Sequence, residues 1–324
     1  MNAIVTTRYG PPEVLELQEI PLPVPREDEV LIKLYASSVN PLDSFTIRGP
    51  LFFLPAIAKR LKPAQPIAGA DLAGSVERVG EHVTRFHPGD EVFGGSFGKH
   101  GLGGFAEYVC AAENCLGKKP VNLTFEEAAA VPVAAITALQ AVRDHGQIRP
   151  GQRVLIDGAS GGVGTFAVQI AKAFGAEVTA VCSPNNAETA RALGADHVID
   201  YTREDFARNS GRYDLILGVN AHHSVFAYWR ALRTDGIFVM VGGEPLRILE
   251  SALLGPLLSI FGSRKMRFFI ARMNDRDLDL LKEMIEAGKV SPVIDRCYPL
   301  SQVADALRYR ELGHARGKIV ITIA

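Results

Sequence analysis

Three glycines stand close together near the middle of the chain, in the segment Ala159–Gly164. The segment follows an apolar run at 153–157, which is typical of a buried strand, and precedes apolar side chains at helical spacing. Because glycine has no Cβ, such a turn can be tight and can approach a pyrophosphate closely, and the amides at the start of the helix then face the anion. The pattern predicts a dinucleotide site; a plain turn that uses glycine for its geometry alone is the alternative. The residues expected to form the site are Ser160, Gly161, Gly162, Val163 and Gly164.

The end of the next expected strand, 177–182, indicates which dinucleotide is bound. Sites for NAD usually carry Asp or Glu there to bind the ribose hydroxyls. This chain continues with Ser183-Pro184-Asn185-Asn186 and has no carboxylate before Glu188. Ser183 and Asn185 offer hydrogen bonds to a 2′-phosphate, so the sequence predicts NADPH. No Lys or Arg lies between Ser183 and Glu188, so the positive partner of the phosphate must come from elsewhere, with Arg203 as a candidate.

Strands and helices alternate through the second half of the chain. After the strands at 153–157 and 177–182, further strands are expected at 197–200, 214–219 and 237–241, with helical segments between them. This alternation predicts a parallel, doubly wound sheet. The helix after the glycines should end at Gly175, and a late helix carrying Leu278, Leu281 and Ile285 on one face should end at Gly288.

The first part of the chain has a different pattern, with short alternating runs separated by Gly and Pro. These runs predict a small antiparallel β domain with strands at 30–34, 74–79, 90–93 and 105–109. Thr124 and Glu127 have the spacing of a capping box, and Pro132 should divide the helical segment that follows. Short strands return at 290–298 and 318–323, so the C-terminal stretch is expected to rejoin the β domain. The prediction is an α/β protein with a β domain at 1–122 and 290–324 and a nucleotide-binding domain at 123–289.

Composition excludes several other classes of protein. A formal net charge of -1 gives no global field for nucleic acid, and 324 residues favour two domains. The four cysteines are scattered, which favours reduced thiols. The N-terminus has no apolar run of the signal-peptide kind, and the most apolar stretch, 246–261, is interrupted by Arg247, Glu250 and Pro256. We therefore expect a cytosolic protein without an integral membrane segment. Two interpretations of the stretch 246–261 remain: a helix that borders the substrate site, or a segment that makes a peripheral membrane contact.

Several blocks of sequence, kept in one order from end to end, carry a resemblance to a known family. Residues 158–172, GASGGVGTFAVQIAK, resemble the nucleotide turn of zinc-independent quinone oxidoreductases in the medium-chain dehydrogenase/reductase superfamily. Within this family the chain is most similar to the branch with chloroplast-envelope quinone oxidoreductase-like and reticulon-interacting-protein-like members. The resemblance implies a GroES-like β domain and a Rossmann domain, with the cofactor between them. The other matching blocks are 38–43, 69–74, 88–92, 104–108, 293–296 and 313–318.

The resemblance gives roles to residues that spacing alone leaves open. It implies that Asn40 contacts the nicotinamide end of the cofactor, with Thr137 near the same ring. It also implies that Tyr201 packs against the adenine and that the loop Gly242–Gly243 passes under the nicotinamide. From the residues alone, Asn40 before a proline is a common turn device, Tyr201 is a surface aromatic and Gly242–Gly243 ends a strand.

Four residues complete the candidate site. We assign Asn40 and Asp43 as candidate catalytic residues, and Phe269 and Lys318 as further contacts of the cofactor. Residues 267–271 resemble the strand that pairs across the subunit boundary in related dimers. An apolar strand at a sheet edge needs covering, so a homodimer is expected.

The positions of metal ligands in zinc-dependent relatives hold other residues here. Those relatives have a cysteine at the position of Asp43 and a His-Glu pair at Ala70-Asp71, and the stretch 94–100 contains none of the cysteines of a structural zinc lobe. Zinc takes three or four nitrogen, sulfur or carboxylate ligands. Asp43, Asp71 and His100 could in principle form a set of zinc ligands, but Ala70 at the position of the histidine removes a normal ligand. The sequence therefore predicts no metal.

Without a metal to stabilise an alkoxide, hydride transfer is easier to a substrate that stabilises its own negative charge. Quinones and α,β-unsaturated carbonyls meet this requirement, so we expect a small, apolar, electrophilic substrate. Where some relatives carry a tyrosine this chain has Phe45, which suggests protonation from water. Phe45 and the apolar residues 51–54 have two interpretations: they cover a hydrophobic substrate, or they fill the core of the β domain. Two other functions remain as alternatives: a non-enzymatic NADPH-binding protein of the crystallin-like or regulatory kind, and an NAD(P)-dependent alcohol dehydrogenase.

Overall fold

The chain forms two units in the computed structural model, which describes residues 1–49, 63, 66–96, 102–208 and 210–323. The β unit comprises Met1–Ala134, Met273–Ala287 and Pro292–Ala324, and the nucleotide unit comprises Ala135–Arg272 and Gly288–Ser291. This division differs from the expected one, because residues 123–134 and 273–287 group with the β unit. The apolar residues 51–54 and His100 lie outside the described residues.

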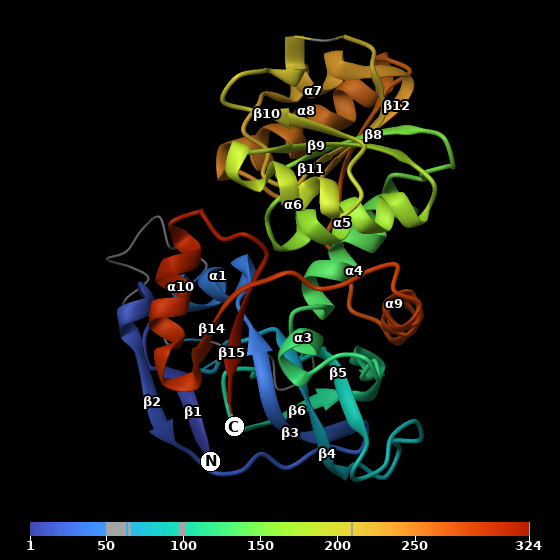
Figure 1. The fold of residues 1–324 in the computed structure, drawn as a ribbon. Coiled ribbons are helices and arrows are strands. Elements are labelled where there is room, and N and C mark those ends of the chain that lie inside the picture. The colour runs from blue at the N-terminus through green and yellow to red at the C-terminus, as the bar shows by residue number, and fades with distance from the viewer. Residues whose placement is uncertain (50–62, 64–65, 97–101, 209, 324) are drawn as a thin grey trace. The chain divides into compact units, whose positions relative to one another are not determined.

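Most strands of the β unit belong to one sheet, which in the described residues has the order β14-β15-β3-β4-β5-β7, with β6 paired to β3 (Figure 1). β15 runs antiparallel to β3 with Val320 opposite Ser38, which confirms that the C-terminal stretch rejoins this unit. A separate antiparallel pair is formed by β1 and β2. The strands are β1 (Asn2–Thr6), β2 (Leu15–Glu19), β3 (Glu29–Ser38), β4 (Asp71–Val79), β5 (Glu91–Gly95), β6 (Tyr108–Ala112), β7 (Leu116–Lys118), β14 (Ile294–Pro299) and β15 (Lys318–Thr322).

Helices of the β unit lie between these strands in sequence. Thr124 and Glu127 form the expected capping box, with the Glu127 amide donating to Thr124 Oγ1 at 3.2 Å and the Thr124 amide donating to Glu127 Oε2 at 2.9 Å. Pro132 separates two helices as predicted. The helices are α1 (Pro41–Arg48), α3 (Phe125–Ala129), α4 (Pro132–Gln140, which runs on into the nucleotide unit), α9 (Asp275–Glu286) and α10 (Val303–Glu311), with short 3₁₀ turns at Pro12–Val14, Glu113–Cys115 and Leu300–Gln302.

The nucleotide unit contains a parallel sheet with the strand order β10-β9-β8-β11-β12-β13 (Figure 1). Every neighbouring pair is parallel, so the doubly wound Rossmann arrangement expected from the sequence is confirmed. The strands are β8 (Arg153–Asp157), β9 (Glu177–Cys182), β10 (His197–Asp200), β11 (Tyr213–Gly218), β12 (Leu232–Met240) and β13 (Lys265–Phe268). The helices are α5 (Gly162–Ala173), α6 (Ala187–Ala192), α7 (Val225–Ala231) and α8 (Pro245–Phe261), with a π-helical turn at Ala141–His145 and 3₁₀ turns at Pro184–Asn186 and Phe206–Arg208.

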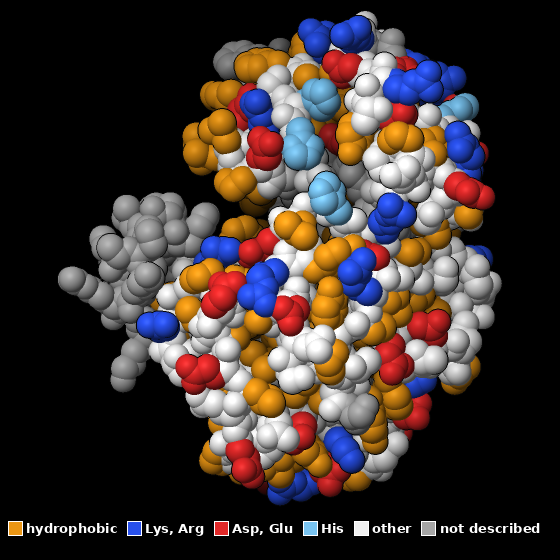
Figure 2. Space-filling view, turned by 60° about the vertical axis from the view of Figure 1, so that its left-hand side comes forward, with side chains coloured by type: hydrophobic (Ala, Val, Ile, Leu, Met, Phe, Trp, Pro, Cys, Tyr) orange, Lys and Arg blue, Asp and Glu red, His pale blue; other side chains and the backbone are white. Residues whose placement is uncertain are grey.

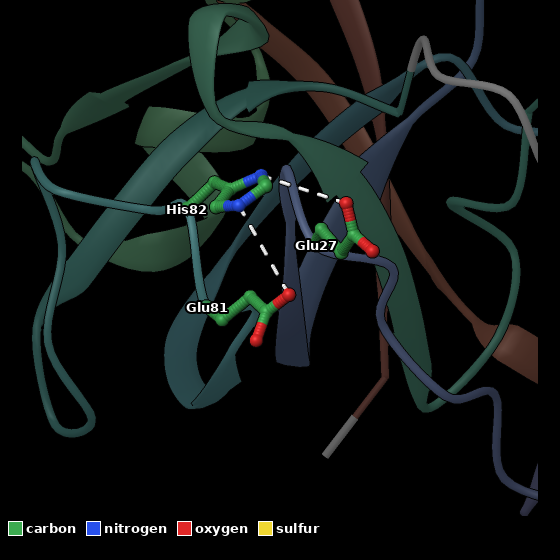
Figure 3. Close-up of side chains that lie close together, drawn as sticks. All are labelled: Glu27, Glu81 and His82. Carbon is green, nitrogen blue, oxygen red and sulfur yellow. Dashed lines mark ion pairs between the residues drawn. The ribbon is translucent and has the colours of Figure 1, made fainter.

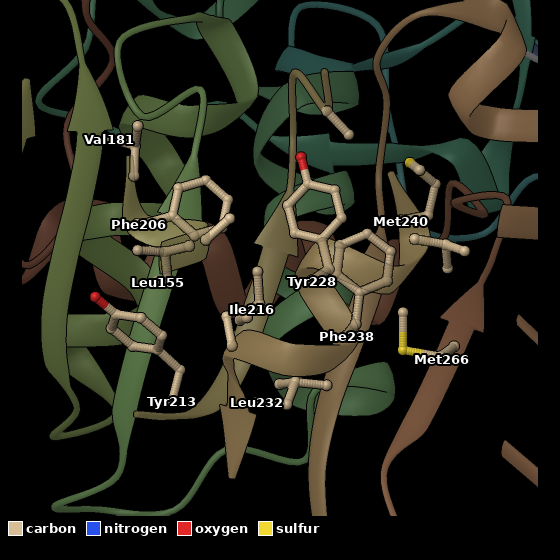
Figure 4. Packing of buried hydrophobic residues seen from close by; sticks show 14 of the residues in the cluster. Leu155, Val181, Phe206, Tyr213, Ile216, Tyr228, Leu232, Phe238, Met240 and Met266 are labelled. Carbon is tan, nitrogen blue, oxygen red and sulfur yellow. The ribbon is translucent and has the colours of Figure 1, made fainter. Parts of the chain in front are cut away.

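A cluster of aromatic and aliphatic side chains fills the core on α7's side of this sheet (Figure 4). Tyr228 of α7 stacks on Phe238 of β12 with ring centroids 4.5 Å apart, and the ring centroids of Phe206 and Tyr228 are 5.7 Å apart. All three side chains are almost fully buried. Apolar burial of this kind is the main favourable contribution to folding, and here it holds α7 and α8 against the strands that carry the dinucleotide turn.

Helix α8 is apolar on both of its faces. Ile248, Leu254 and Leu258 pack against the core cluster. The exposed residues of the helix, among its described side chains, are Pro245, Leu246, Leu249, Ala252, Leu253, Pro256, Leu257 and Ile260, and all are apolar. The helix has 17 residues, and no helix in the described part of the chain is long and apolar enough to span a membrane. On the face shown in Figure 2, acidic and basic side chains are interspersed over the surface.

Candidate active site

The carboxyl ends of the parallel strands bring most of the predicted cofactor residues to one edge of the nucleotide unit. Residues 158–164 follow β8, Ser183 follows β9, Tyr201 follows β10 and Gly242–Gly243 comes just after β12. Phe269 follows β13 in the same way. In doubly wound sheets ligands bind at this edge, where the strand order reverses, and here it reverses at β8 and β11.

The glycine turn has the geometry of an anion site. Gly161 is the N-cap of α5, and the first bond of the helix runs from the Thr165 amide to the Gly161 carbonyl at 2.9 Å. The first N–H groups of the helix, those of Gly162, Val163 and Gly164, come before Thr165 in the chain and therefore have no acceptor within the helix. A Cβ on Gly164 would lie 2.1 Å from the Gly158 carbonyl oxygen, so only glycine lets α5 pack this closely on the turn. A Cβ on Gly161 would meet nothing nearer than 3.9 Å, which leaves room above the turn for a ligand.

The ends of β9 and β10 lie side by side. Cys182 is opposite Asp200 in the sheet register, and the Tyr201 amide donates to the Cys182 carbonyl at 3.4 Å. Ser183 is half-buried and accepts a hydrogen bond of 3.1 Å from the Asn186 side chain, while Asn185 is exposed. Tyr201 is 61% exposed, so its ring is free to pack against a flat ligand. Arg203, two residues on, is also exposed.

Three other predicted residues occupy different surroundings in this unit. Gly243 has a φ of 146° and pairs with Ala221, whose carbonyl oxygen would lie 2.5 Å from a Cβ at that position. Phe269 stacks on His145 with ring centroids 4.3 Å apart, beyond the end of β13. Residues 267–271 were expected to form one strand, but the strand ends at Phe268. Thr137 is half-buried in α4.

A buried Asp-Tyr pair beneath the turn was not anticipated from the sequence. Asp157 is the last residue of β8, and its carboxylate accepts a hydrogen bond of 2.5 Å from the hydroxyl of Tyr228. Burial raises the pKa of this carboxyl above its ordinary value and also raises the pKa of Tyr228. In the sequence, an acidic residue at the end of an apolar strand could have marked Asp157 as unusual. Its partner Tyr228 lies 71 residues away, and only the fold brings the two side chains together.

In the β unit, three side chains and one main-chain amide form a buried polar network around Asp71. Asp71 Oδ2 accepts hydrogen bonds from Ser38 Oγ at 2.5 Å, Asn40 Nδ2 at 2.8 Å and Lys318 Nζ at 3.1 Å. Asp71 Oδ1 accepts from the Val133 amide at 2.8 Å, near the N-terminus of α4. Asp71 is fully buried, and Asn40 and Lys318 are each 3% exposed. A buried carboxylate is stable only when it is paired and hydrogen-bonded, and this one has four donors, one of them a cation.

Asp43, the third residue of α1, lies next to this network. Its Oδ2 accepts from the Asn40 amide at 2.7 Å and its Oδ1 accepts from the Gly69 amide at 3.1 Å. The carboxyl is fully buried, and burial, together with the negative charge of Asp71, raises its pKa to about 7. Through these two hydrogen bonds, Asp43 links the N-terminus of α1 to the loop at Gly69. The sequence places both aspartates at zinc-ligand positions, but it did not predict the ion pair between Lys318 and Asp71.

The donor set of this network does not suit zinc. Both oxygens of Asp43 and both oxygens of Asp71 already accept hydrogen bonds from protein groups. A divalent ion on Asp71 Oδ2 would also lie close to the Lys318 ammonium, which is 3.1 Å from that oxygen, and like charges repel strongly in a buried site. Cysteine and histidine, the usual zinc ligands, are absent from this network.

Elsewhere in the described residues, one group has three side chains close enough to share a metal ion: Glu27, Glu81 and His82 (Figure 3). All three are exposed, and His82 lies 3.5 Å from Glu27 and 4.0 Å from Glu81 as ion pairs. Exposed charge clusters of this kind are common on protein surfaces, and this one makes only weak pairs.

The glycine turn at the start of a Rossmann sheet defines a dinucleotide-binding protein. A model of the alcohol dehydrogenase GroES-like domain matches residues 26–121, and a model of zinc-binding dehydrogenases matches residues 193–321. The chain is 35% identical over 359 residues to the mitochondrial NAD(P)H oxidoreductase RTN4IP1 of Mus musculus, covering 100% of this chain and 89% of that relative. It is 36% identical over 331 residues to 2-methylene-furan-3-one reductase of Solanum lycopersicum, covering 99% and 79%.

Among solved structures, the quinone oxidoreductase from Coxiella burnetii is similar over 100% of this chain and 99% of its own length. The TM-score is 0.87 and the sequence identity is 32%. The chain belongs to the quinone oxidoreductase family of medium-chain dehydrogenases/reductases. It is therefore an oxidoreductase of a family that uses NAD(P)H.

Proposed function

We propose that the protein transfers hydride from NADPH to a quinone or to an α,β-unsaturated carbonyl compound, without zinc. Relatives named for a quinone and for 2-methylene-furan-3-one, a methylene conjugated to a ketone, support this substrate class. The preference for NADPH is supported by the end of β9, where Ser183 and Asn185 stand in place of a carboxylate.

The proposal rests on one observation: both carboxylate oxygens of Asp71 already accept hydrogen bonds from protein groups, and one of the donors is the Lys318 ammonium. A zinc-dependent alcohol dehydrogenase uses the metal as a Lewis acid to stabilise an alkoxide. Asp71, at one of the ligand positions, binds the Lys318 ammonium instead. The substrate must then delocalise its own negative charge, as a quinone or an enone does.

Each group of residues has a distinct task in this scheme. The amides of Gly162, Val163 and Gly164 bind the pyrophosphate, and Ser183, Asn185 and Arg203 bind the 2′-phosphate. Tyr201 packs on the adenine, whereas Thr137, Gly242–Gly243 and Phe269 surround the nicotinamide end.

In the β unit, Asn40 contacts the nicotinamide end of the cofactor. Bound NADPH supplies the hydride, so the protein supplies orientation and excludes water. Phe45 of α1 is 51% exposed and carries no hydroxyl, so the proton that completes the reduction comes from water.

Product analysis tests this function. Purified protein is incubated with NADPH and, separately, with 2-hexenal and with a benzoquinone, and the products are identified by mass spectrometry. Saturated aldehyde or hydroquinone formed with matching NADPH consumption supports the proposal. Oxidation of a simple alcohol with NADP⁺ instead would indicate an alcohol dehydrogenase. NADPH binding with no turnover of either substrate would favour the non-enzymatic alternative.

A further inference from the structure

Lys318 is a buried lysine whose hydrogen bonds to described residues all end within the β unit. It is the first residue of β15, and the register that pairs Val320 with Ser38, continued by two residues, places it opposite Asn40. Its ammonium lies 2.7 Å from Asn40 Oδ1, 3.1 Å from Asp71 Oδ2 and 3.4 Å from the Val39 carbonyl oxygen. An ammonium has three N–H donors, and three protein acceptors surround this one. The direct contact of Lys318 with the cofactor stays a prediction, and in the described residues its ammonium contacts Asn40, Asp71 and Val39.

These two neighbours determine which way the Asn40 amide points. Lysine can only donate a hydrogen bond and a carboxylate can only accept one. The amide oxygen must therefore face Lys318, and the amide nitrogen must face Asp71, at 2.7 and 2.8 Å. The second N–H of Asn40 donates to the Ser38 carbonyl at 3.3 Å. The Asp43 amide, which faces the Asn40 N-cap, donates to the Asn40 backbone carbonyl at 3.2 Å, so among the described residues no second donor reaches the amide oxygen. The position left on the side chain for a ligand is the second lone pair of this oxygen.

We propose that Lys318 is a positioning residue that holds the Asn40 amide in one orientation, so that Asn40 meets its ligand as an acceptor and never as a donor. The matching group on the ligand is a hydroxyl or an N–H, such as a ribose hydroxyl or a carboxamide N–H. The role assigned to Asn40 in this inference rests on the proposed function. The orientation itself is a property of the β unit alone.

The charge of Lys318 has a second consequence. Asp43 and Asp71 are both fully buried, and both lie within the influence of the ammonium. The lysine gives the pair the compensating charge that a buried carboxylate requires. Because the cation is part of the chain, it cannot be lost to a chelator.

A double-mutant cycle tests whether Lys318 acts through Asn40. The variants are Lys318→Met, which has similar length without charge or donors, Asn40→Ala and the combination of both. Lys119→Met is the matched control. Lys119 is a second buried lysine of the β unit, 7% exposed at its side chain, and its ammonium donates to the Leu123 carbonyl at 2.7 Å and pairs with Glu91.

With Asn40 present, Lys318→Met should lower NADPH turnover about tenfold or more, as loss of a hydrogen bond to a charged group does. In the Asn40→Ala background the same change should lower turnover by less than about threefold, because the residue through which Lys318 acts is gone. NADPH affinity should change little in either background, and Lys119→Met should retain turnover. Equal losses in both backgrounds would overturn the proposal.

Nuclear magnetic resonance of the cofactor-free protein gives a readout independent of turnover. In the unaltered protein the two side-chain N–H signals of Asn40, identified by their absence in Asn40→Ala, should exchange slowly with water. Lys318→Met should speed this exchange at least about tenfold, whereas Lys119→Met should not. Should Lys318→Met fail to fold, the unaltered protein still decides the matter, because rapid exchange of these protons there refutes the fixed amide. A protein with slow exchange but no turnover of quinone or enone would refute the proposed function and leave the positioning intact.

Discussion

The side-chain amide of Asn40 donates a hydrogen bond of 2.8 Å to the carboxylate of Asp71, and both residues are almost completely buried. An asparagine amide can offer a ligand both a donor and an acceptor. In the structure both of its N–H groups serve Asp71 and Ser38. Asn40 is thus a structural member of the β unit as well as a candidate contact of the cofactor.

Asn40→Ala should lower turnover more than it weakens NADPH binding. The pyrophosphate contacts proposed for the amides of Gly162, Val163 and Gly164 are untouched, whereas the contact at the nicotinamide end is lost. Loss of one such hydrogen bond costs about 1–3 kcal/mol, which corresponds to a rate loss of roughly ten- to a hundredfold. Stopped-flow or steady-state assays with a quinone or an alkenal measure it, well below the unfolding temperature because Asp71 loses a donor as well. Turnover at the parental rate would show that Asn40 is only a turn residue.

Cofactor preference is predicted from the end of β9. Isothermal titration should show tighter binding of NADPH than of NADH, because no carboxylate stands between Ser183 and Glu188 to repel the 2′-phosphate. Ser183→Asp should narrow or reverse the difference by adding a negative charge there. Arg203→Ala, which removes an exposed cation from the neighbouring β10 end, should weaken NADPH and leave NADH unchanged. Equal affinities of the unaltered protein for the two cofactors would contradict the prediction.

Metal content is predicted from the donor set of the Asp71 network. Elemental analysis of the purified protein should find far less than one zinc ion per chain, and a chelator should leave NADPH turnover intact. The physical reason is the Lys318 ammonium, which holds the Asp71 carboxylate in place of a metal ion. One zinc per chain, removed by the chelator together with activity, would overturn this reading of the site.

Assembly is predicted from the edge of the parallel sheet. β13 is the last strand of the sheet in the described residues, and α8 packs against it. The exposed residues of α8, among its described side chains, are all apolar, whereas Arg247 and Glu250 are partly buried. A symmetric partner would cover both features, so light scattering at micromolar concentration should give a dimer. Leu253→Glu, at a residue 63% exposed on α8, should shift the protein toward monomer. Leu312→Glu, at a residue 67% exposed in the β unit, should not. A monomeric unaltered protein would refute the prediction.

Local sequence patterns predicted several regular elements closely, although the strand expected at 105–109 lies at Tyr108–Ala112 and the strand expected at 237–241 begins at Leu232. The strands at 153–157, 177–182 and 197–200 begin and end where expected, because apolar runs bounded by turn residues are a strong local signal. Gly175 and Gly288 have φ values of 80° and 68° and follow the helices they were expected to end. These features depend on residues only a few positions apart.

The polar networks were harder to foresee because they depend on contacts distant in sequence. Lys318 and Asn40 are 278 residues apart, and only the antiparallel pairing of β15 with β3 makes them neighbours. In the same way Asp157 meets Tyr228 through the packing of α7 on the sheet. Family resemblance pointed to Asn40, Asp43 and Lys318 as individual residues, but the hydrogen bonds of Asn40 and Lys318 to Asp71, and of the Asn40 backbone amide to Asp43, required the fold.

The last prediction concerns the pH dependence of stability, and it follows from Asp43. Burial raises the pKa of this carboxyl from an ordinary value of 3.8 to about 7, so the native state retains a proton that the unfolded chain has already lost. Between about pH 4 and pH 7, the contribution of Asp43 to the free energy of unfolding should therefore fall as the pH rises, by up to about 1.4 kcal/mol per pH unit, and should level off above pH 7.

Asp43→Asn removes this titration, so its unfolding free energy should vary less with pH over the same range, whatever its absolute stability. Asp157, whose pKa burial also raises, is present in both proteins, so its contribution cancels from the difference. Lys318, Asp71 and Arg310 also act on Asp43 and are likewise common to both. Urea denaturation followed by circular dichroism at half-unit steps from pH 5 to pH 8 measures both curves. If the two curves run parallel, Asp43 is ionised throughout this range in the folded protein.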